Sequence, residues 1–473
     1  MPWTAEQLQV LDHVPQKGQM ILVTALPGTG KTTVCEALIK RHAHPTTCKI
    51  FFTMLSAKLA QEAKERLQEE SVECGTFHSM ALGVMQKISE NPLEVADIVE
   101  NVEKGVFATL ENYWKSVDRD LQWKHTPPMK TKRYAYSDAQ RNRLWMLAQG
   151  VQTDMEMGRR PVTHLAYLKM CTKIPSALTT IASMYDCIIV DEAQDVPPCF
   201  VSLLVRLQPH CCIYLVGDPN QQIFLFSGAA SAFSVQGTHH FTLSQSFRFG
   251  PTVAQLANKV VQTCRQTKDV AMPNIISDHQ EYKTIVMKTI SFEDMISSGQ
   301  QFALICRVNM TILEHAMILI EHGISFHIVG EPARAIIEYI VPWAMQYDAW
   351  APESRNALAA STRSKYYTRP EGGGKEVVAL NFAEKHQRRA YSFDEFARYH
   401  TDHPSLAQVI LVSAHQSKGM EFDLVVLADD YPDIFAEESL PNQDEETNII
   451  FVAMTRCKKH LILNKTLSEK YFT

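Results

Sequence analysis

The stretch that decides the fold is ILVTALPGTGKTTVCEAL, residues 21–38. It begins as an apolar strand, passes through a loop of small residues and continues with the spacing of an amphipathic helix. A loop of this kind leaves backbone N–H groups pointing into one concavity at a helix N-terminus, where the helix dipole favours an anion. The stretch therefore predicts a site for a phosphate group.

The residues of this loop have separate expected roles. Gly28 and Gly30 let the backbone approach closely, Lys31 neutralises the outer phosphates, and Thr32 ligates a magnesium ion, as in the pattern G-x-x-x-x-G-K-[ST]. Ala25 stands where that pattern has its first glycine. The alternative interpretation is a strand-turn-helix corner with a surface lysine. The predicted nucleotide-binding residues of the loop are Ala25, Pro27, Gly28, Thr29, Gly30, Lys31, Thr32 and Thr33.

Composition limits the remaining possibilities. The chain has 473 residues, of which 45% are hydrophobic and 21% charged, and no apolar run approaches the roughly 20 residues of a membrane span. The first residues lack a secretory pattern, so we expect an intracellular, reducing environment in which the 11 cysteines are thiols. Their spacing suits neither a zinc nor an iron–sulfur site.

A formal net charge of −6 gives no overall attraction to nucleic acid, so any such surface has to be local. Two segments combine basic and aromatic residues, 123–136 and 362–370. Either can hold backbone phosphates and stack bases, and either can equally be a solvated charged loop.

Short apolar strands alternate with helical stretches along the chain, which predicts an α/β fold with largely parallel sheets. A mainly helical and polar region interrupts the first series of strands, and a region containing three consecutive glycines interrupts the second. The expected strands are 20–25, 49–54, 187–193, 212–218, 302–307, 326–330, 409–414, 424–429 and 460–464.

A second chemical signal is CIIVDEAQD, residues 187–195. An apolar strand that ends in two acids presents them at its carboxyl end, where ligands bind in open α/β sheets. Asp191 is predicted to hold the magnesium and Glu192 to polarise the water that attacks the γ-phosphate. The alternative is that both acids are solvated turn residues, and the neighbouring phosphate loop at 25–32 favours the catalytic interpretation.

Together these motifs resemble those of the UvrD/Rep-type DNA helicases of superfamily 1, in which alanine is usual at the position of Ala25. The resemblance runs from Gln7 to Arg456 with the motifs in the family order, and it is strongest to the F-box DNA helicase branch, although no F-box precedes Gln7. It implies two RecA-like P-loop NTPase domains, each with an inserted, mainly helical subdomain. The implied domains are 1–84 with 176–245 (1A), 85–175 (1B, helical), 246–330 with 405–473 (2A), and 331–404 (2B, a reduced accessory insertion).

The resemblance also implies roles for residues outside the loop. Gln7 reads the adenine edge, Phe247 stacks on adenine, and Glu421 contacts the ribose. Gln221 senses the γ-phosphate. Arg248 and Arg456 reach the phosphates, and Arg456 does so from the second RecA-like domain.

For DNA, the resemblance implies contacts by Thr76 and His78 with the backbone, base stacking by Phe226, and a DNA-facing position for His415. Two departures from the family pattern stand out. The segment 52–60 lacks the usual Thr-Phe-x-Asn-Lys arrangement, and Ser227 replaces an arginine.

The expected function is an ATP- and Mg²⁺-dependent DNA helicase moving 3′ to 5′ on single-stranded DNA, in DNA repair, recombination or replication. A translocase that strips proteins from DNA and a non-catalytic scaffold with the same fold are the alternatives. The expected partners are single-stranded DNA and junctions, with a recombinase filament as a displaced substrate; the chain is expected to be a monomer that binds no membrane. Its expected location is nuclear in a eukaryotic cell and otherwise cytoplasmic.

Overall fold

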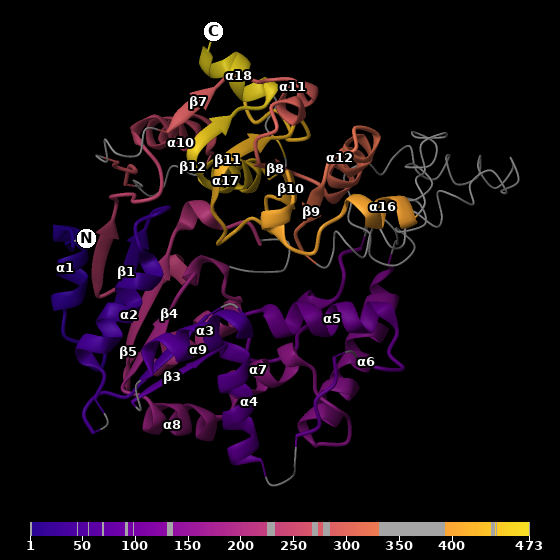
Figure 1. Ribbon diagram of the computed structural model, residues 1–473. Coiled ribbons are helices and arrows are strands. Elements are labelled where there is room, and N and C mark those ends of the chain that lie inside the picture. Colours follow the sequence, from indigo (N-terminus) through magenta and orange to yellow (C-terminus); the bar gives the residue numbers. More distant parts are fainter. Residues whose placement is uncertain are drawn as a thin grey trace, which may run out of the picture. The chain divides into compact units, whose positions relative to one another are not determined.

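The computed structural model describes residues 2–44, 46–54, 56–68, 71–89, 93–97, 99–129, 136–224, 232–266, 273–277, 284–330, 393–436, 440 and 442–472. The chain divides into two compact units, Met1–Phe247 and Arg248–Thr473 (Figure 1). The finer domain bounds expected from the sequence stay predictions.

In its described part, the first unit is built on a sheet with the strand order β3-β2-β4-β5-β1-β6, and all neighbouring strands run parallel. This confirms the predicted parallel α/β architecture for the first unit. The carboxyl ends of β4, β5 and β1 therefore meet at one edge. The strands are β1 (Met20–Ala25), β2 (Ile50–Thr53), β3 (Val72–Gly75), β4 (Cys187–Val190), β5 (Cys212–Gly217) and β6 (His239–Leu243).

Strand β1 shows why a strand covered on both faces reads as one continuous apolar run. Met20 and Leu22 belong to the apolar cluster on one face of the sheet, and Ile21 and Val23 to the cluster on the other. Side chains alternate between the faces, and helices cover both, so the positions on both faces are apolar from Met20 to Val23. The edge strands β3 and β6 are only partly buried, which is why their sequences carried no strand signal.

Helices cover this sheet, and several of them fall within the stretch predicted to be a helical insertion. Figure 1 shows α5 and α6 of that stretch side by side, away from the labelled strands β1, β4 and β5. The α-helices are α1 (Ala5–Asp12), α2 (Lys31–His42), α3 (Ala57–Leu67), α4 (Phe77–Ile88), α5 (Lys104–Lys115), α6 (Asp138–Glu156), α7 (His164–Lys173), α8 (Pro175–Met184) and α9 (Pro198–Leu207). The 3₁₀ turns are η1 (Trp123–His125), η2 (Ala193–Asp195), η3 (Pro219–Gln221) and η5 (Ala232–Ser234).

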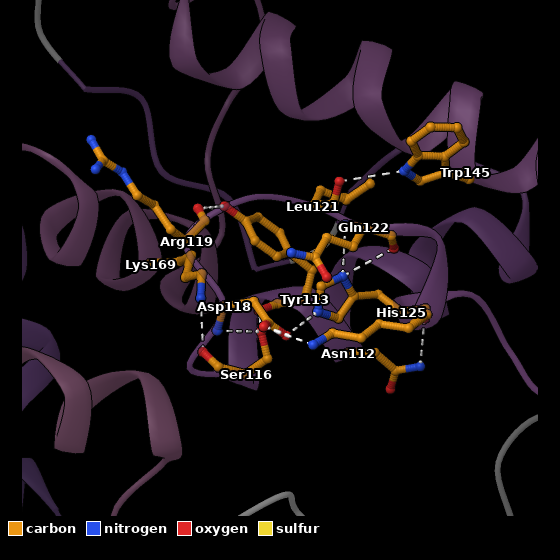
Figure 2. Close-up of polar contacts among 11 residues, drawn as sticks. Asn112, Tyr113, Ser116, Asp118, Arg119, Leu121, Gln122, His125, Trp145 and Lys169 are labelled. Atoms are coloured by element: carbon orange, nitrogen blue, oxygen red, sulfur yellow. Dashed lines mark hydrogen bonds and ion pairs between the residues drawn. The ribbon is translucent and has the colours of Figure 1, made fainter.

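A polar network holds the chain that leaves α5 (Figure 2). Lys169 of α7 is buried and donates through Nζ to the carbonyl oxygen of Ser116 at 2.7 Å. Asp118 accepts from Lys124 Nζ at 2.7 Å and pairs with His125 Nε2 at 2.8 Å. Burial lowers the pKa of Lys169 to about 8, because the charged ammonium loses its hydration there.

The described part of the second unit holds another wholly parallel sheet, in the order β7-β12-β11-β8-β10-β9. It confirms the second predicted series of strands and adds the short β7, which the sequence did not indicate. The strands are β7 (Ile285–Met287), β8 (Phe302–Cys306), β9 (Phe326–Ile328), β10 (Val409–Ser413), β11 (Phe422–Leu427) and β12 (Cys457–Ile462).

In the described part of the second unit, helix α10 (Pro251–Cys264) precedes the first strand, α18 (Lys465–Phe472) follows the last, and the other helices lie between strands in sequence. These others are α11 (Phe292–Ser297), α12 (Asn309–Glu321), α16 (Phe393–Tyr399), η7 (Pro404–Leu406) and α17 (Gln443–Met454). Most of the predicted accessory insertion at 331–404 lies outside the described residues. A search of the described residues finds no helix long and apolar enough to cross a membrane.

Candidate nucleotide site

The loop between β1 and α2 has the backbone that its glycines were expected to allow. Gly28 and Gly30 have φ values of +76° and +77°, in the left-handed region that favours glycine. Gly30 caps α2, which begins at Lys31, so the N–H groups of the first helical turn point out of the helix end without intrahelical acceptors. This arrangement can receive an anion.

Lys31 lies at this helix end and folds over the loop. Its Nζ donates to the carbonyl oxygen of Ala25, the last residue of β1, at 3.2 Å. The ammonium is thereby held at the mouth of the anion-binding loop, where it can neutralise a phosphate.

Thr32 and Asp191 are 159 positions apart in the chain and meet at the sheet edge. Thr32 Oγ1 donates to Asp191 Oδ2 at 2.8 Å, and the backbone N–H of Glu192 donates to Asp191 Oδ1 at 2.9 Å. Burial, and then the charge of Glu192, raise the pKa of Asp191 to about 6. The structure thus brings the predicted hydroxyl and carboxylate ligands of magnesium into contact.

Glu192 follows with a left-handed backbone, φ +53°, which is uncommon for a residue other than glycine and concentrates at functional sites. Its carboxylate accepts from the side-chain amide of Gln194, which is fully buried in η2. The oxygen of the Gln194 side-chain amide, Oε1, accepts from the backbone N–H of Asp218 at 3.1 Å. Gln194 was part of the quoted motif but received no role, since its partners are visible only in three dimensions.

The predicted sensor residue Gln221 lies in η3, directly after β5. Its Nε2 donates to Asp218 Oδ2 at 2.8 Å, and both side chains are buried. Burial raises the pKa of Asp218 above its usual value. The structure therefore places Gln221 on a tightly held turn at the carboxyl end of β5, the strand next to β4.

Gln7 and Phe247 lie against the same loop. Gln7 Oε1 accepts from the backbone N–H of Thr4 at 3.0 Å, and its Nε2 donates to the carbonyl oxygen of Thr29 at 3.1 Å. The backbone N–H of Phe247 donates to the carbonyl oxygen of Gly28 at 2.8 Å. Because an amide has two N–H donors and an oxygen with two lone pairs, Gln7 retains one donor and one acceptor for a base edge.

In the second unit, three predicted residues gather around Thr455. Arg248 donates through Nε to Glu421 Oε1 at 2.8 Å and through Nη1 to the carbonyl oxygen of Thr455 at 3.0 Å. Arg456 donates through Nη2 to the hydroxyl of Thr455 at 3.2 Å and through Nε to the carbonyl oxygen of Val452 at 2.9 Å. The two guanidinium groups are therefore positioned by one residue that the sequence did not single out.

Of the residues predicted to contact DNA, Thr76 caps α4, and its hydroxyl accepts from the N–H of Ser79 at 3.1 Å. The ring of His78 packs against Phe77 and Tyr167, and its Nε2 has no hydrogen-bond partner. Burial lowers the pKa of His78 to about 4, so the ring is neutral near pH 7 and offers no positive charge to a phosphate.

The remaining DNA predictions are only partly visible. His415 lies half-buried in the turn after β10, and Phe226 and Ser227 lie outside the described residues. The basic segment 362–370 also lies outside them. In segment 123–136, the Arg141 guanidinium lies 3.8 Å from the centre of the Trp123 ring, so that ring already has a cationic neighbour.

Three family models match parts of the chain. Residues 9–227 match an AAA domain model, residues 391–468 match the UvrD-like helicase C-terminal domain, and residues 151–336 match the viral superfamily 1 RNA helicase core domain. These matches agree with the parallel α/β architecture of both units.

Individual relatives agree with the family models. The chain is 27% identical to F-box DNA helicase 1 of Gallus gallus, over 98% of this chain and 49% of that protein. It is 27% identical to F-box DNA helicase protein 1 of Schizosaccharomyces pombe, over 99% of this chain and 58% of that protein. The ATP-dependent DNA helicase UvrD2 of Mycobacterium bovis is 27% identical over 60% of this chain and 48% of its own length. The chain thus spans about half the length of the curated relatives it matches.

Proposed function

Because residues 391–468 match the UvrD-like helicase C-terminal domain and nearly the whole chain is similar to F-box DNA helicases, we propose that this protein is an ATP-dependent DNA helicase. The observation that carries the proposal is the contact of Thr32 with Asp191 at the end of the glycine loop, with Glu192 beside it. The names of the relatives supply both parts of this proposal, ATP dependence and DNA unwinding. The residues of this site have the chemistry that ATP hydrolysis requires.

The loop residues and Lys31 are proposed to bind the β- and γ-phosphates of ATP, and Gln7 to present its remaining donor and acceptor to the adenine edge. Adenine N6 and N7 form a donor and acceptor pair that a glutamine amide matches in two hydrogen bonds. Phe247, half-buried beside Gly28, is proposed to stack on the base.

Magnesium fits the donor set at Thr32 and Asp191. A hydroxyl and a carboxylate oxygen are the hard ligands that Mg²⁺ takes, together with phosphate oxygens and water. A bound Mg²⁺ would supply charge neutralisation between the β- and γ-phosphates.

Glu192 is proposed to accept a proton from the attacking water. The water oxygen then bonds to the γ-phosphorus, the bond from the γ-phosphorus to the bridging oxygen breaks, and ADP and phosphate leave. Gln221 is proposed to respond to the loss of the γ-phosphate. Arg248 and Arg456 are proposed to stabilise the negative charge of the transition state, in agreement with their common anchoring at Thr455.

The test of ATP hydrolysis measures phosphate release with and without single-stranded DNA, in the parent chain and in Lys31→Ala and Glu192→Gln. Lys40→Ala is the matched control, since Lys40 is exposed in the last turn of the same helix α2. We expect the parent and the control to hydrolyse ATP faster when DNA is present, and the two site variants to lose turnover. A parent chain with no ATP hydrolysis under any DNA condition would contradict the proposal and favour a scaffold.

The finer aspects of the function are proposals from the family: 3′ to 5′ movement on single-stranded DNA, action at junctions in repair, recombination or replication, function as a monomer, and a nuclear location in a eukaryotic cell. Strand displacement from duplexes with a 3′ or a 5′ tail measures the polarity. The same preparations assayed for removal of a recombinase filament measure protein stripping. Filament removal without strand separation would reassign the motor as a stripping translocase.

A further inference from the structure

Both the nitrogen and the oxygen of the Gln194 side-chain amide have hydrogen-bond partners, although the proposed mechanism gives this residue no role. Its Nε2 donates to Glu192 Oε2 and also to Asp195 Oδ2, the latter at 3.4 Å. The side-chain Oε1 accepts from the backbone N–H of Asp218 at 3.1 Å. The backbone carbonyl oxygen of Gln194 accepts from Gln222 Nε2 at 3.0 Å. One residue therefore bonds the carboxylate after β4 and the turn after β5.

The orientation of this amide is determined by its neighbours. A backbone N–H can only donate, so Oε1 has to face Asp218, and the NH₂ group has to face the carboxylate of Glu192. Gln194 is fully buried, so no water competes for these bonds. A buried hydrogen bond to a charged acceptor is stronger than a neutral one and more costly to lose.

The space around Gln194 is equally restricted. Gly217, the last residue of β5, lies so close that a Cβ atom there would be 2.1 Å from Gln194 Oε1. The Gln194 amide therefore packs directly against the backbone of β5, in the space that any side chain at position 217 would need. Glu192 itself has a left-handed backbone, and its carboxylate accepts from the amide of Gln194.

From these contacts we infer that Gln194 is a positioning residue, which holds the carboxylate of Glu192 toward the attacking water and links it to the turn 218–222. The inference rests on the proposed ATP hydrolysis. Because Gln221 bonds to Asp218 on the same turn, a change at Gln221 reaches Glu192 through Asp218 and Gln194. The direction of the catalytic carboxylate then depends on what Gln221 contacts.

Two substitutions separate this role from a structural one. Gln194→Met keeps the length of the side chain and removes all its hydrogen bonds. Gln194→Glu keeps an oxygen for the N–H of Asp218 and removes the donors to Glu192. Gln208→Met is the matched control, since the amide of Gln208 donates to the carbonyl oxygen of Gly18 at 3.0 Å and contacts none of the proposed catalytic groups.

The experiment measures single-turnover hydrolysis of bound ATP, the dissociation constant of a fluorescent ATP analogue and the melting temperature of each variant. We expect both Gln194 variants to hydrolyse ATP about 10²-fold more slowly than the parent while binding the analogue within about threefold, because a misdirected group affects the chemical step. The Gln208→Met control should hydrolyse at the parent rate.

Three results would overturn the inference. Parent-like hydrolysis by Gln194→Glu would show that only the contact with Asp218 matters. A loss of analogue affinity in Gln194→Glu as large as its loss of rate would show a structural role. A control as slow as the Gln194 variants would show that the assay reports general destabilisation. If the parent chain itself hydrolyses no ATP, the proposed function fails as well, which distinguishes that outcome from the first three.

Discussion

Gly217→Ala is the substitution whose effect the structure predicts most directly. The added Cβ would be 2.1 Å from Gln194 Oε1, 3.0 Å from the backbone nitrogen of Ala193 and 3.1 Å from Cε2 of Phe233. The first separation is impossible, so the Gln194 side chain has to leave its position. The N–H of Asp218 then loses its acceptor, and the carboxylate of Glu192 loses a donor.

The expected cost follows from those two losses. An unsatisfied buried N–H costs about 1–3 kcal/mol, and a lost hydrogen bond to a charged group about 1.5–3 kcal/mol, so we expect Gly217→Ala to lower the free energy of unfolding by about 2.5–6 kcal/mol. For a unit of this size, each kcal/mol shifts the melting temperature by about 2–4 °C, which gives a decrease of roughly 5–24 °C. Gly150→Ala in α6 is the control, because a Cβ there meets no atom within 4 Å.

A double-mutant cycle tests whether Gln194 is the cause. Gln194→Ala removes the atom that clashes, so the double variant Gly217→Ala/Gln194→Ala should be about as stable as Gln194→Ala alone, to within about 1 kcal/mol. The coupling energy then equals the loss in Gly217→Ala itself, about 2.5–6 kcal/mol. The assay is calorimetric melting of the four proteins. The reasoning is refuted if the two losses add, or if Gly217→Ala melts at the parent temperature.

Three further predictions concern other parts of the molecule. Trp114→Phe should lower the free energy of unfolding by about 1–3 kcal/mol in urea titrations, because Trp114 Nε1 donates to the buried Gln152 Oε1 at 2.7 Å; an unchanged midpoint would contradict this. Lys169 has a pKa of about 8 in the folded state, below its unfolded value, so the unfolded state binds more protons between about pH 8 and 10.5 and stability rises with pH there. Melting temperatures of the parent and Lys169→Met should therefore diverge in favour of the parent as the pH rises through this window, and parallel curves would exclude the effect. Arg456→Lys should lower kcat for ATP by roughly 10³-fold or more with nucleotide affinity retained, since the guanidinium fork is lost; more than a tenth of parental turnover would assign the arginine a structural role.

The sequence alone was sufficient for the elements buried on both faces of a sheet. Strands β4, β5 and β8, and β1 apart from Thr24, are apolar runs because helices cover both sides, so their composition identifies them without knowledge of their partners. The glycine loop and the two acids after β4 were also predicted from the sequence, because such motifs require certain residue types at fixed local spacing.

Tertiary structure decided the contacts that make these motifs into a site. Thr32 meets Asp191, and Gln194 meets Asp218, only because β4, β5 and β1 are neighbours in a parallel sheet and end at the same edge. The strand order is not written in any local pattern, and neither is the anchoring of two arginines by Thr455. The sequence shows which functional group each residue carries. Which other group it contacts depends on how distant segments of the chain pack.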